Sequence, residues 1–380
     1  MRKYFLLLFI FLLIFSSEKI YSQDSSKLRI SLLTCSPGEE LYSIFGHSAI
    51  RVTDSTSLTY LVYNYGTFNF DDEGFYLKFV RGKLLYYLSI ERFIDFRDSY
   101  KAEGRGLTEQ VLELSAKEKI DLQHALNENL KEENKYYHYD FFLDNCTTML
   151  RDLIVETKKP NPVLPAVMPV NTKFRQAIHQ YLDAGKQHWS KLGIDILLGA
   201  PTDAIMTPAQ QEFLPDNLMF ALNKSSDKIV KQESELFTGV KPNGNLIIFT
   251  PLVLFFLLFV VVTLMSLSKN TKVSFVLLSF DKLLFFVAGL LGIIIILMWF
   301  ATDHSMTKNN YNIIWAWPTH FFAILFLNKK SKFKKYYFGI NAITMALLLF
   351  AWNFLPQQLN ASLIPIVALL GYRSFANYSR

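Results

Sequence analysis

The chain has 380 residues, of which 51% are hydrophobic and 15% aromatic, and its formal net charge is +6 at pH 7. The hydrophobic excess over a typical soluble protein is concentrated in residues 1–22 and 246–372. Much of the positive charge lies beside apolar segments, in the cluster from Lys329 to Lys335, where it orients membrane helices and so argues against nucleic-acid binding.

The N-terminus has the pattern of a secretory signal peptide. Arg2 and Lys3 precede an apolar run that ends near Phe15, and a Ser-rich stretch follows. We expect cleavage after Ser22, which gives a signal peptide at residues 1–22 and an exported domain at residues 23–240. The alternative is a retained N-terminal anchor, for which the apolar run is short.

Residues 23–240 mix strand and helix patterns, which indicates an α+β domain. Alternation of apolar and polar residues predicts strands at Leu28–Leu33, Ser48–Val52 and Tyr60–Tyr65. Helical spacing predicts helices at Thr108–Asn129, Asn171–Ala184 and Thr207–Leu222. The first of these helices would have its N-cap at Thr108 or Ser115. The charged, Ser-containing stretch Lys224–Gly244 is interpreted as a tether to the membrane.

Two short motifs carry the residues best suited to chemistry. Gly46-His47 opens a predicted strand, and Asp144-Asn145-Cys146 precedes a helix-like run. A thiol at a helix N-terminus has its thiolate stabilised by the helix dipole and by unpaired amides. The amide of Cys146 would be placed to donate to an oxyanion, and a neutral imidazole within reach would accept the thiol proton. We therefore interpret Cys146 as a nucleophile and His47 as its base.

The same residues allow a structural interpretation. Cys35 and Cys146 are the two cysteines of an exported domain, and an oxidising compartment favours a disulfide between them. A single histidine on a strand is more often a packed or surface residue than a catalytic one. The residues alone leave both interpretations open.

Five apolar stretches predict an all-α membrane domain of five transmembrane helices over residues 246–372. They are Leu246–Leu267, Leu283–Phe300, Ile313–Leu327, Tyr336–Phe354 and Leu359–Tyr372. Lysines fill the first connection, through Lys269, Lys272 and Lys282, and the third, through the Lys329–Lys335 cluster. Lys-rich connections belong in the cytoplasm, so the C-terminus would lie inside and residues 23–240 outside. This topology is that of a multi-pass protein of the bacterial inner membrane with a periplasmic N-terminal domain.

One extracytoplasmic connection, residues 302–312, is unusually rich in polar side chains. It contains His304 and Asn312, and Trp315 follows at the start of the third stretch. Aromatic residues at this depth are most often interfacial anchors. The polar side chains could equally bind a lipid headgroup or complete a site.

Several motifs together resemble known families. Gly-His before a strand, followed roughly a hundred residues later by Asn-Cys opening a helix, resembles the circularly permuted branch of the NlpC/P60 papain-like superfamily. A closer resemblance, to the Lnb family of lipoprotein N-acyltransferases of the Bacteroidetes, covers nearly the whole chain. Its motifs are Thr34–Gly38, Phe45–His47, Asn64–Phe68, Lys78–Gly82, Asp144–Thr148, and the set Asp303, His304, Asn312, Trp315 and Pro318.

This resemblance implies an acyl transfer that needs no cofactor and no metal. A fatty acyl chain would move from a phospholipid, through a Cys146 thioester, to the α-amino group of the diacylglyceryl cysteine of lipoproteins. His47 would move the protons, and Asn64 is the candidate for the third residue that orients the imidazole, although a structural hydrogen bond would explain it as well. The candidate substrate-binding residues are Arg81, His304, Asn312 and Trp315. Where the family pattern often has Arg, this chain has Met149, which leaves the role of that basic position in doubt.

Two other functions remain open at this stage. One is a cell-wall peptidase or amidase, the commonest use of NlpC/P60 domains. The other is a non-enzymatic envelope-assembly protein held by a Cys35–Cys146 disulfide. An aromatic cluster near the His47 strand is either ordinary core or a wall for acyl chains and an interfacial contact; its members are Tyr63, Tyr65, Phe68, Phe70, Phe75 and Tyr76.

Overall fold

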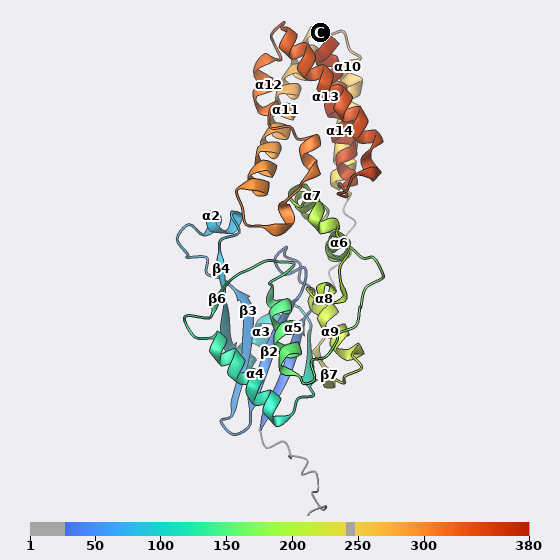
Figure 1. Cartoon of the computed structure of the whole chain (residues 1–380). Helices are drawn as coiled ribbons and strands as arrows, with labels where there is room; N and C mark the ends of the chain where they lie inside the picture. Colours follow the sequence, from blue (N-terminus) through green and yellow to red (C-terminus); the bar gives the residue numbers. More distant parts are fainter. Residues whose placement is uncertain (1–26, 241–247, 380) are drawn as a thin grey trace, which may run out of the picture.

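The protein is elongated, with an α+β domain at one end and a helical bundle at the other (Figure 1). The computed structural model describes residues 27–240 and 248–379. The expected signal peptide, residues 1–22, lies outside these ranges. The last helix of the bundle ends on the side away from the α+β domain (Figure 1).

The centre of the α+β domain is a seven-stranded sheet in which every neighbouring pair is antiparallel. Its strand order is β6-β4-β3-β2-β1-β5-β7. The strands are β1 (Leu28–Cys35), β2 (His47–Asp54), β3 (Thr59–Thr67), β4 (Leu85–Arg92), β5 (Leu107–Leu112), β6 (Tyr136–His138) and β7 (Val230–Phe237). The three strands predicted from alternation are confirmed as β1, β2 and β3.

Helices cover both faces of this sheet. The helices described in this domain are α2 (Phe75–Val80), α3 (Phe93–Ala102), α4 (Ala116–Asn129), α5 (Cys146–Thr157), α6 (Phe174–Ala184), α7 (His188–Leu197), α8 (Pro208–Gln211) and α9 (Pro215–Lys224). Of these, α3, α4, α5 and α9 pack on the sheet, whereas α2, α6 and α7 lie toward the bundle (Figure 1). On one face, Leu122 of α4 and Leu150 of α5 join a buried core with Ile30 and Ile50 of the strands. On the other face, Phe96 of α3 packs in a smaller buried cluster. The sheet is therefore the middle of three layers.

Three local predictions need correction. The first part of the predicted helix Thr108–Asn129 is strand β5; the helix begins after Ser115, whose hydroxyl accepts the amide of Glu118 in a capping box. Pro215 starts a new helix inside the predicted helix Thr207–Leu222. The interpretation of Lys224–Gly244 as a tether is wrong for Val230–Phe237, because these residues form β7, which pairs with β5 at the edge of the sheet. Because an edge strand of mostly exposed residues lacks apolar alternation, its sequence gave no strand signal.

The bundle is built from α10 (Pro251–Ser266), α11 (Thr271–Phe300), α12 (His320–Ala323), α13 (Lys332–Phe350) and α14 (Ile364–Ser379). Within the described residues, α11 is the one helix that is long and apolar enough to cross a membrane, with a mean hydropathy of 2.9, and α10 is a shorter apolar helix. The third predicted span forms short helical turns around Pro318 in place of one helix. The count of five spans stays a prediction.

Helix α11 begins earlier than predicted, so Lys272 and Lys282 lie within it and not in a connection. A buried ion pair explains how the helix continues through charged residues. Arg373 of α14 donates from Nε and Nη2 to the carboxylate of Asp281, at 2.6 and 2.9 Å. Asn377 donates to the same carboxylate at 2.8 Å. Because the buried Asp281 carboxylate is paired and hydrogen-bonded, its burial is tolerated, and the ion pair links α11 to α14.

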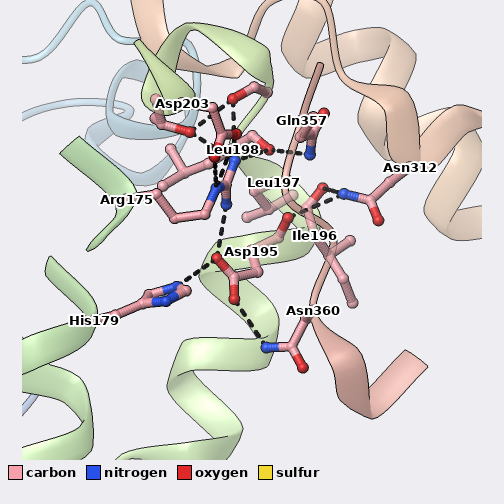
Figure 2. A network of polar contacts seen from close by, with 12 residues as sticks. Arg175, His179, Asp195, Ile196, Leu197, Leu198, Asp203, Asn312, Gln357 and Asn360 are labelled. Atoms are coloured by element: carbon pink, nitrogen blue, oxygen red, sulfur yellow. Dashed lines mark hydrogen bonds and ion pairs between the residues drawn. The ribbon is translucent and has the colours of Figure 1, made fainter. Parts of the chain in front are cut away.

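A second buried polar network joins the bundle to the α+β domain (Figure 2). Arg175 of α6 donates to Asp195 of α7 at 2.7 Å and to Asp203 at 3.1 Å, and all three side chains are almost completely buried. Asn360 of the bundle donates to the second oxygen of Asp195 at 2.8 Å. The network fixes how the two halves are oriented.

The end of α7 is held by amide side chains of the bundle (Figure 2). Asn310 and Asn312 donate to carbonyl groups in the last turn of α7, and Gln357 donates to the carbonyl of Leu198. The last carbonyls of a helix have no partner within it, so these amides satisfy groups that would otherwise be buried and unpaired.

Candidate active site

Cys146 is the first residue of α5, and a buried cap fixes its position. Asn145 accepts the amides of Thr147 and Thr148 through its Oδ1 atom, at 2.8 and 2.9 Å. Its Nδ2 atom donates to the carbonyls of Phe141 and Phe213, at 2.7 and 2.8 Å. The cap does not use the amide of Cys146, so this N–H stays beside the sulfur at the positive end of the helix dipole.

His47 is the first residue of β2 and follows a strained turn. Gly46 has φ +81°, and a Cβ atom there would lie 2.8 Å from the carbonyl oxygen of Cys35, so only glycine fits. The Nε2 atom of His47 lies 3.2 Å from Oδ1 of Asn64 on the neighbouring strand β3. Asn64 in turn donates from Nδ2 to Glu91 of β4 at 2.7 Å. Three adjacent strands thus align the imidazole, an amide and a carboxylate.

The charges of His47 and Cys146 stabilise each other. Burial alone raises the pKa of the Cys146 thiol, but the neighbouring imidazole, the Ser48 amide and the Thr147 hydroxyl outweigh it and lower this pKa to about 7. Burial alone lowers the pKa of His47, but the adjacent Cys146 thiolate and the hydrogen bonds with Cys146 and Asn64 outweigh it and raise this pKa above its ordinary value. The arrangement favours a thiolate facing an imidazolium.

Cys35 is chemically different from Cys146. Both cysteines are free thiols, so the expected alternative of a Cys35–Cys146 disulfide is wrong for this structure. Cys35 pairs with His47 across β1 and β2 and is fully buried. Burial raises the pKa of the Cys35 thiol well above its ordinary value, against the opposing effects of Arg105 and Tyr100. This thiol therefore stays protonated and inert.

Cys146 and His47 open into a cavity of about 510 Å³. Aromatic side chains form much of its wall, and they come from Phe45, Tyr65, Phe68, Phe79, Tyr86, Tyr100, Tyr139, Phe141 and Phe213. Arg105 and Glu103 line it as well. A second, mostly apolar cavity of about 250 Å³ shares Phe141 and His304 with the first. Two adjacent, largely apolar cavities are suited to hold a long, flexible, water-insoluble chain.

The predicted site residues separate into two groups. Asn64 lies beside His47, and His304 reaches the cavity from the loop that follows α11. Arg81 does not line the cavity: its side chain is exposed, and its carbonyl accepts the amide of Asp303 at 2.9 Å. Asn312 and Trp315 are buried away from the cavity. Asn312 caps α7 and accepts the indole N–H of Trp315 at 2.9 Å, so both carry a structural role there.

Sequence reasoning missed several residues at the site. Glu91 lies on β4, a strand that the alternation pattern did not reveal, and Tyr100 stacks near His47 from α3. Tyr139 follows β6 and lines the cavity close to Cys146. No local motif marks these residues, because only the pairing of distant strands brings them to the site. Among the described residues, no cluster of three or more His, Cys, Asp or Glu is arranged to hold a metal ion.

Fold and site together define a class of envelope protein: an α+β domain with a Cys-His pair in a cavity, mounted on a bundle with lipid-compatible helices. Residues 18–175 match the Lnb N-terminal periplasmic domain, and residues 243–380 match the Lnb transmembrane domain. The chain belongs to the Lnb family. Membership implies a periplasmic domain on a transmembrane domain and a role in lipoprotein modification at the envelope. No curated protein and no solved structure matches the chain.

Proposed function

We propose that this protein is a lipoprotein N-acyltransferase. It moves a fatty acyl chain from a phospholipid, through a thioester on Cys146, to the α-amino group of the diacylglyceryl cysteine of lipoproteins. The observation that carries the proposal is the cavity: a Cys-His pair opens into an aromatic chamber, and part of its wall is His304 of the transmembrane domain. Such a chamber suits an acyl chain drawn from a membrane.

In the first half of the reaction, the Cys146 thiolate attacks the carbonyl carbon of the donor ester. The amide of Cys146 donates a hydrogen bond to the oxyanion that forms. The carbon–oxygen ester bond then breaks, and the protonated His47 gives its proton to the departing alkoxide of the lysophospholipid. The products of this half are a lysophospholipid and a Cys146 thioester.

In the second half, the lipoprotein amine attacks the thioester carbonyl. Neutral His47 accepts a proton from the amine, the carbon–sulfur bond breaks, and the thiolate and imidazolium are restored. Asn64 keeps the imidazole oriented in both halves, because its Oδ1 atom pairs with Nε2 and leaves Nδ1 for the sulfur. Aromatic walls exclude water, which favours transfer to the amine over hydrolysis.

In the same proposal the bundle spans the inner membrane with five segments, and the C-terminus lies in the cytoplasm. Lys329 and Lys330 lie in the connection before α13, and Lys332, Lys334 and Lys335 lie in the first turn of α13; this end of the bundle would then face the cytoplasm, as the positive-inside rule requires. The periplasmic end of the bundle is the end that contacts the α+β domain.

Mass spectrometry of lipoprotein N-termini tests the proposal directly. Depletion of the protein in its host is expected to leave lipoproteins with a free α-amino group, and Cys146→Ala is expected not to restore acylation. A fatty acid trapped on Cys146 after incubation with phospholipid vesicles would identify the intermediate. Persistent N-acylation after depletion, in a host without a redundant enzyme, would refute the proposal.

The rival function, a cell-wall peptidase or amidase, predicts a different product. The purified protein would release peptides or amino sugars from peptidoglycan in a Cys146-dependent reaction, and no acyl thioester would form. An aromatic chamber that the transmembrane domain helps to close is a poor fit for a long polar peptide strand, so we rank acyl transfer above it.

A further inference from the structure

We propose that the α2 segment, residues 70–83, dips into the periplasmic leaflet of the membrane and forms the entrance through which a lipid acyl chain reaches Cys146. Its membrane insertion is independent of the proposed function, whereas the identity of the lipid that enters rests on that function. The segment contains α2, the turn before it and the basic turn after it.

The α2 segment exposes far more apolar surface than so short a helix normally does. Tyr76 is 80% exposed and Leu77 64%, and Phe70, Phe79 and Val80 are each at least half exposed. Only Phe75 of the helix is buried. A contiguous apolar patch of this kind on the surface marks a site of contact with a partner or a membrane.

The position of the segment identifies the membrane as that partner. Helix α11 ends at Phe300, and the loop after it holds the segment directly. His304 donates from Nε2 to the carbonyls of Phe79 and Val80, at 3.1 Å each. The amide of Asp303 donates to the carbonyl of Arg81 at 2.9 Å. Figure 1 shows α2 beside this loop, at the junction of the two halves. Since α11 is long enough to cross the bilayer, its end lies near the bilayer surface, and α2 lies at that level.

The basic residues of the segment are suited to a lipid surface. Lys78, Arg81 and Lys83 are exposed between and after the apolar residues, whereas Asp71, Asp72 and Glu73 precede α2, so the segment has no net formal charge. Aromatic and aliphatic residues interleaved with Lys and Arg are typical of elements that lie in the interface, with the cations at the level of the lipid phosphates.

The same segment is a wall of the catalytic cavity. Phe79 and Gly82 line the cavity together with His304. Gly82 has φ +68°, and a Cβ atom there would lie 3.2 Å from the amide nitrogen of His304, so the two halves are closely packed at this edge. Leu41 and Tyr42 also line the cavity and are exposed. Exposed apolar residues therefore belong to the cavity wall, and they offer an acyl chain an apolar surface on its way to Cys146.

Depth-dependent quenching tests the insertion without relying on any catalytic activity. In a Cys146→Ser background, where Cys35 is fully buried, Leu77→Cys carries an environment-sensitive NBD label. In vesicles of phosphatidylethanolamine and phosphatidylglycerol, its emission is expected to shift to the blue and to be quenched by doxyl lipids labelled near the headgroup. The matched control is Ile120→Cys on α4, 54% exposed and at a distance from the bundle, whose label is expected to be unaffected. A Leu77 label that behaves like the Ile120 label overturns the proposal.

Two alkylating agents test the entrance in the full chain. Iodoacetamide reaches Cys146 from water, and hexadecyl iodoacetamide reaches it from the bilayer; in both cases the thiolate displaces iodide. Leu77→Asp with Val80→Asp is expected to slow alkylation by the hexadecyl reagent roughly tenfold, because the interface disfavours the added charges. Alkylation by iodoacetamide in the same variant is expected to be unchanged, which shows that the site is intact.

Ile120→Asp is the control and is expected to change neither rate. Equal rates of hexadecyl alkylation in the wild type and the α2 variant would overturn the proposal that the α2 segment forms the entrance. That result would leave the acyl-transfer proposal standing, since the chain could then enter elsewhere. If instead the entrance is verified but no acyl thioester forms with phospholipid, the proposed function fails and the lipid entrance remains.

Discussion

The two cysteines lie in one domain but in opposite electrostatic environments. Cys35 is enclosed by the sheet and α3, where burial dominates and favours the neutral thiol. Cys146 is partly exposed to the cavity, faces an imidazole and lies at a capped helix start. Two features therefore distinguish Cys146 from Cys35, namely the neighbouring positive charge and access to the cavity.

The first prediction follows from this difference. The rate of Cys146 alkylation by iodoacetamide is expected to rise with pH through a midpoint near 7, since the thiolate forms above its pKa. His47→Ala removes the opposing positive charge and leaves burial, so the midpoint is expected to move to 9.0 or higher. At neutral pH this shift lowers the thiolate fraction roughly fifty-fold. The measurement is a pH–rate profile followed by mass spectrometry of the alkylated protein.

Variants of the two residues behind His47 serve as controls in the same profile. Asn64→Ala loses the partner of Nε2 and is expected to raise the midpoint less than His47→Ala does. Glu91→Gln keeps an acceptor for Asn64 and is expected to leave the midpoint unchanged. An unchanged midpoint in His47→Ala would mean that the imidazole does not stabilise the thiolate.

Part of this site was predictable from sequence because its residues carry local signals. Gly46 beside His47 and Asn145 beside Cys146 mark a tight turn and a helix cap, and both features are present in the fold. Asn64 was selected as the third residue and does lie beside His47. Glu91 could not be selected, because its role depends on the pairing of β3 with β4.

At the scale of elements, the buried ionic network in Figure 2 makes a second prediction. Arg175→Met leaves Asp195 and Asp203 buried without their shared cation, and it is expected to destabilise the protein by roughly 3–5 kcal/mol. The control is Arg97→Met, which breaks an exposed pair with Asp98 and is expected to cost at most about 1 kcal/mol. Unfolding in detergent compares the two. Equal effects would mean that the network does not stabilise the junction.

Helices and strands could be predicted where the spacing of apolar residues agrees with the capping residues. They could not be predicted where packing against distant parts of the chain determines the structure. Strands β1, β2 and β3 alternate and were found, whereas β7 is an edge strand of charged residues. Asn312 and Trp315 were selected as substrate-binding because polar and aromatic residues in a short loop resemble a headgroup site. The structure uses Asn312 to cap α7, and the sequence cannot distinguish an amide that binds a ligand from one that satisfies a helix carbonyl.

At the scale of the molecule, the Cys146–His47 pair and the wall of its cavity come from different parts of the chain. Cys146, His47 and Asn64 all belong to the α+β domain, so the reactive pair does not need the bundle. The chamber does, because His304 lines both cavities and Ser305 donates to Asp140 at 2.6 Å across the junction. A bundle that acted only as an anchor would have no reason to supply part of the cavity wall.

The third prediction separates these contributions. A chimera in which one unrelated transmembrane helix replaces residues 248–380 is expected to keep a Cys146 alkylation midpoint near pH 7, because the imidazole still faces the thiol. The same chimera is expected to lose at least about tenfold in the rate at which phospholipid forms the Cys146 thioester, because the α2 segment and the chamber lose their support from Asp303 and His304.

In the full chain, His304→Ala with Ser305→Ala is expected to show a smaller loss of the same kind. A chimera that retains both the midpoint and the thioester rate would demonstrate that the bundle is only an anchor. If the alkylation midpoint also moved away from pH 7, the Cys146–His47 pair itself would depend on the bundle, contrary to its location within one domain.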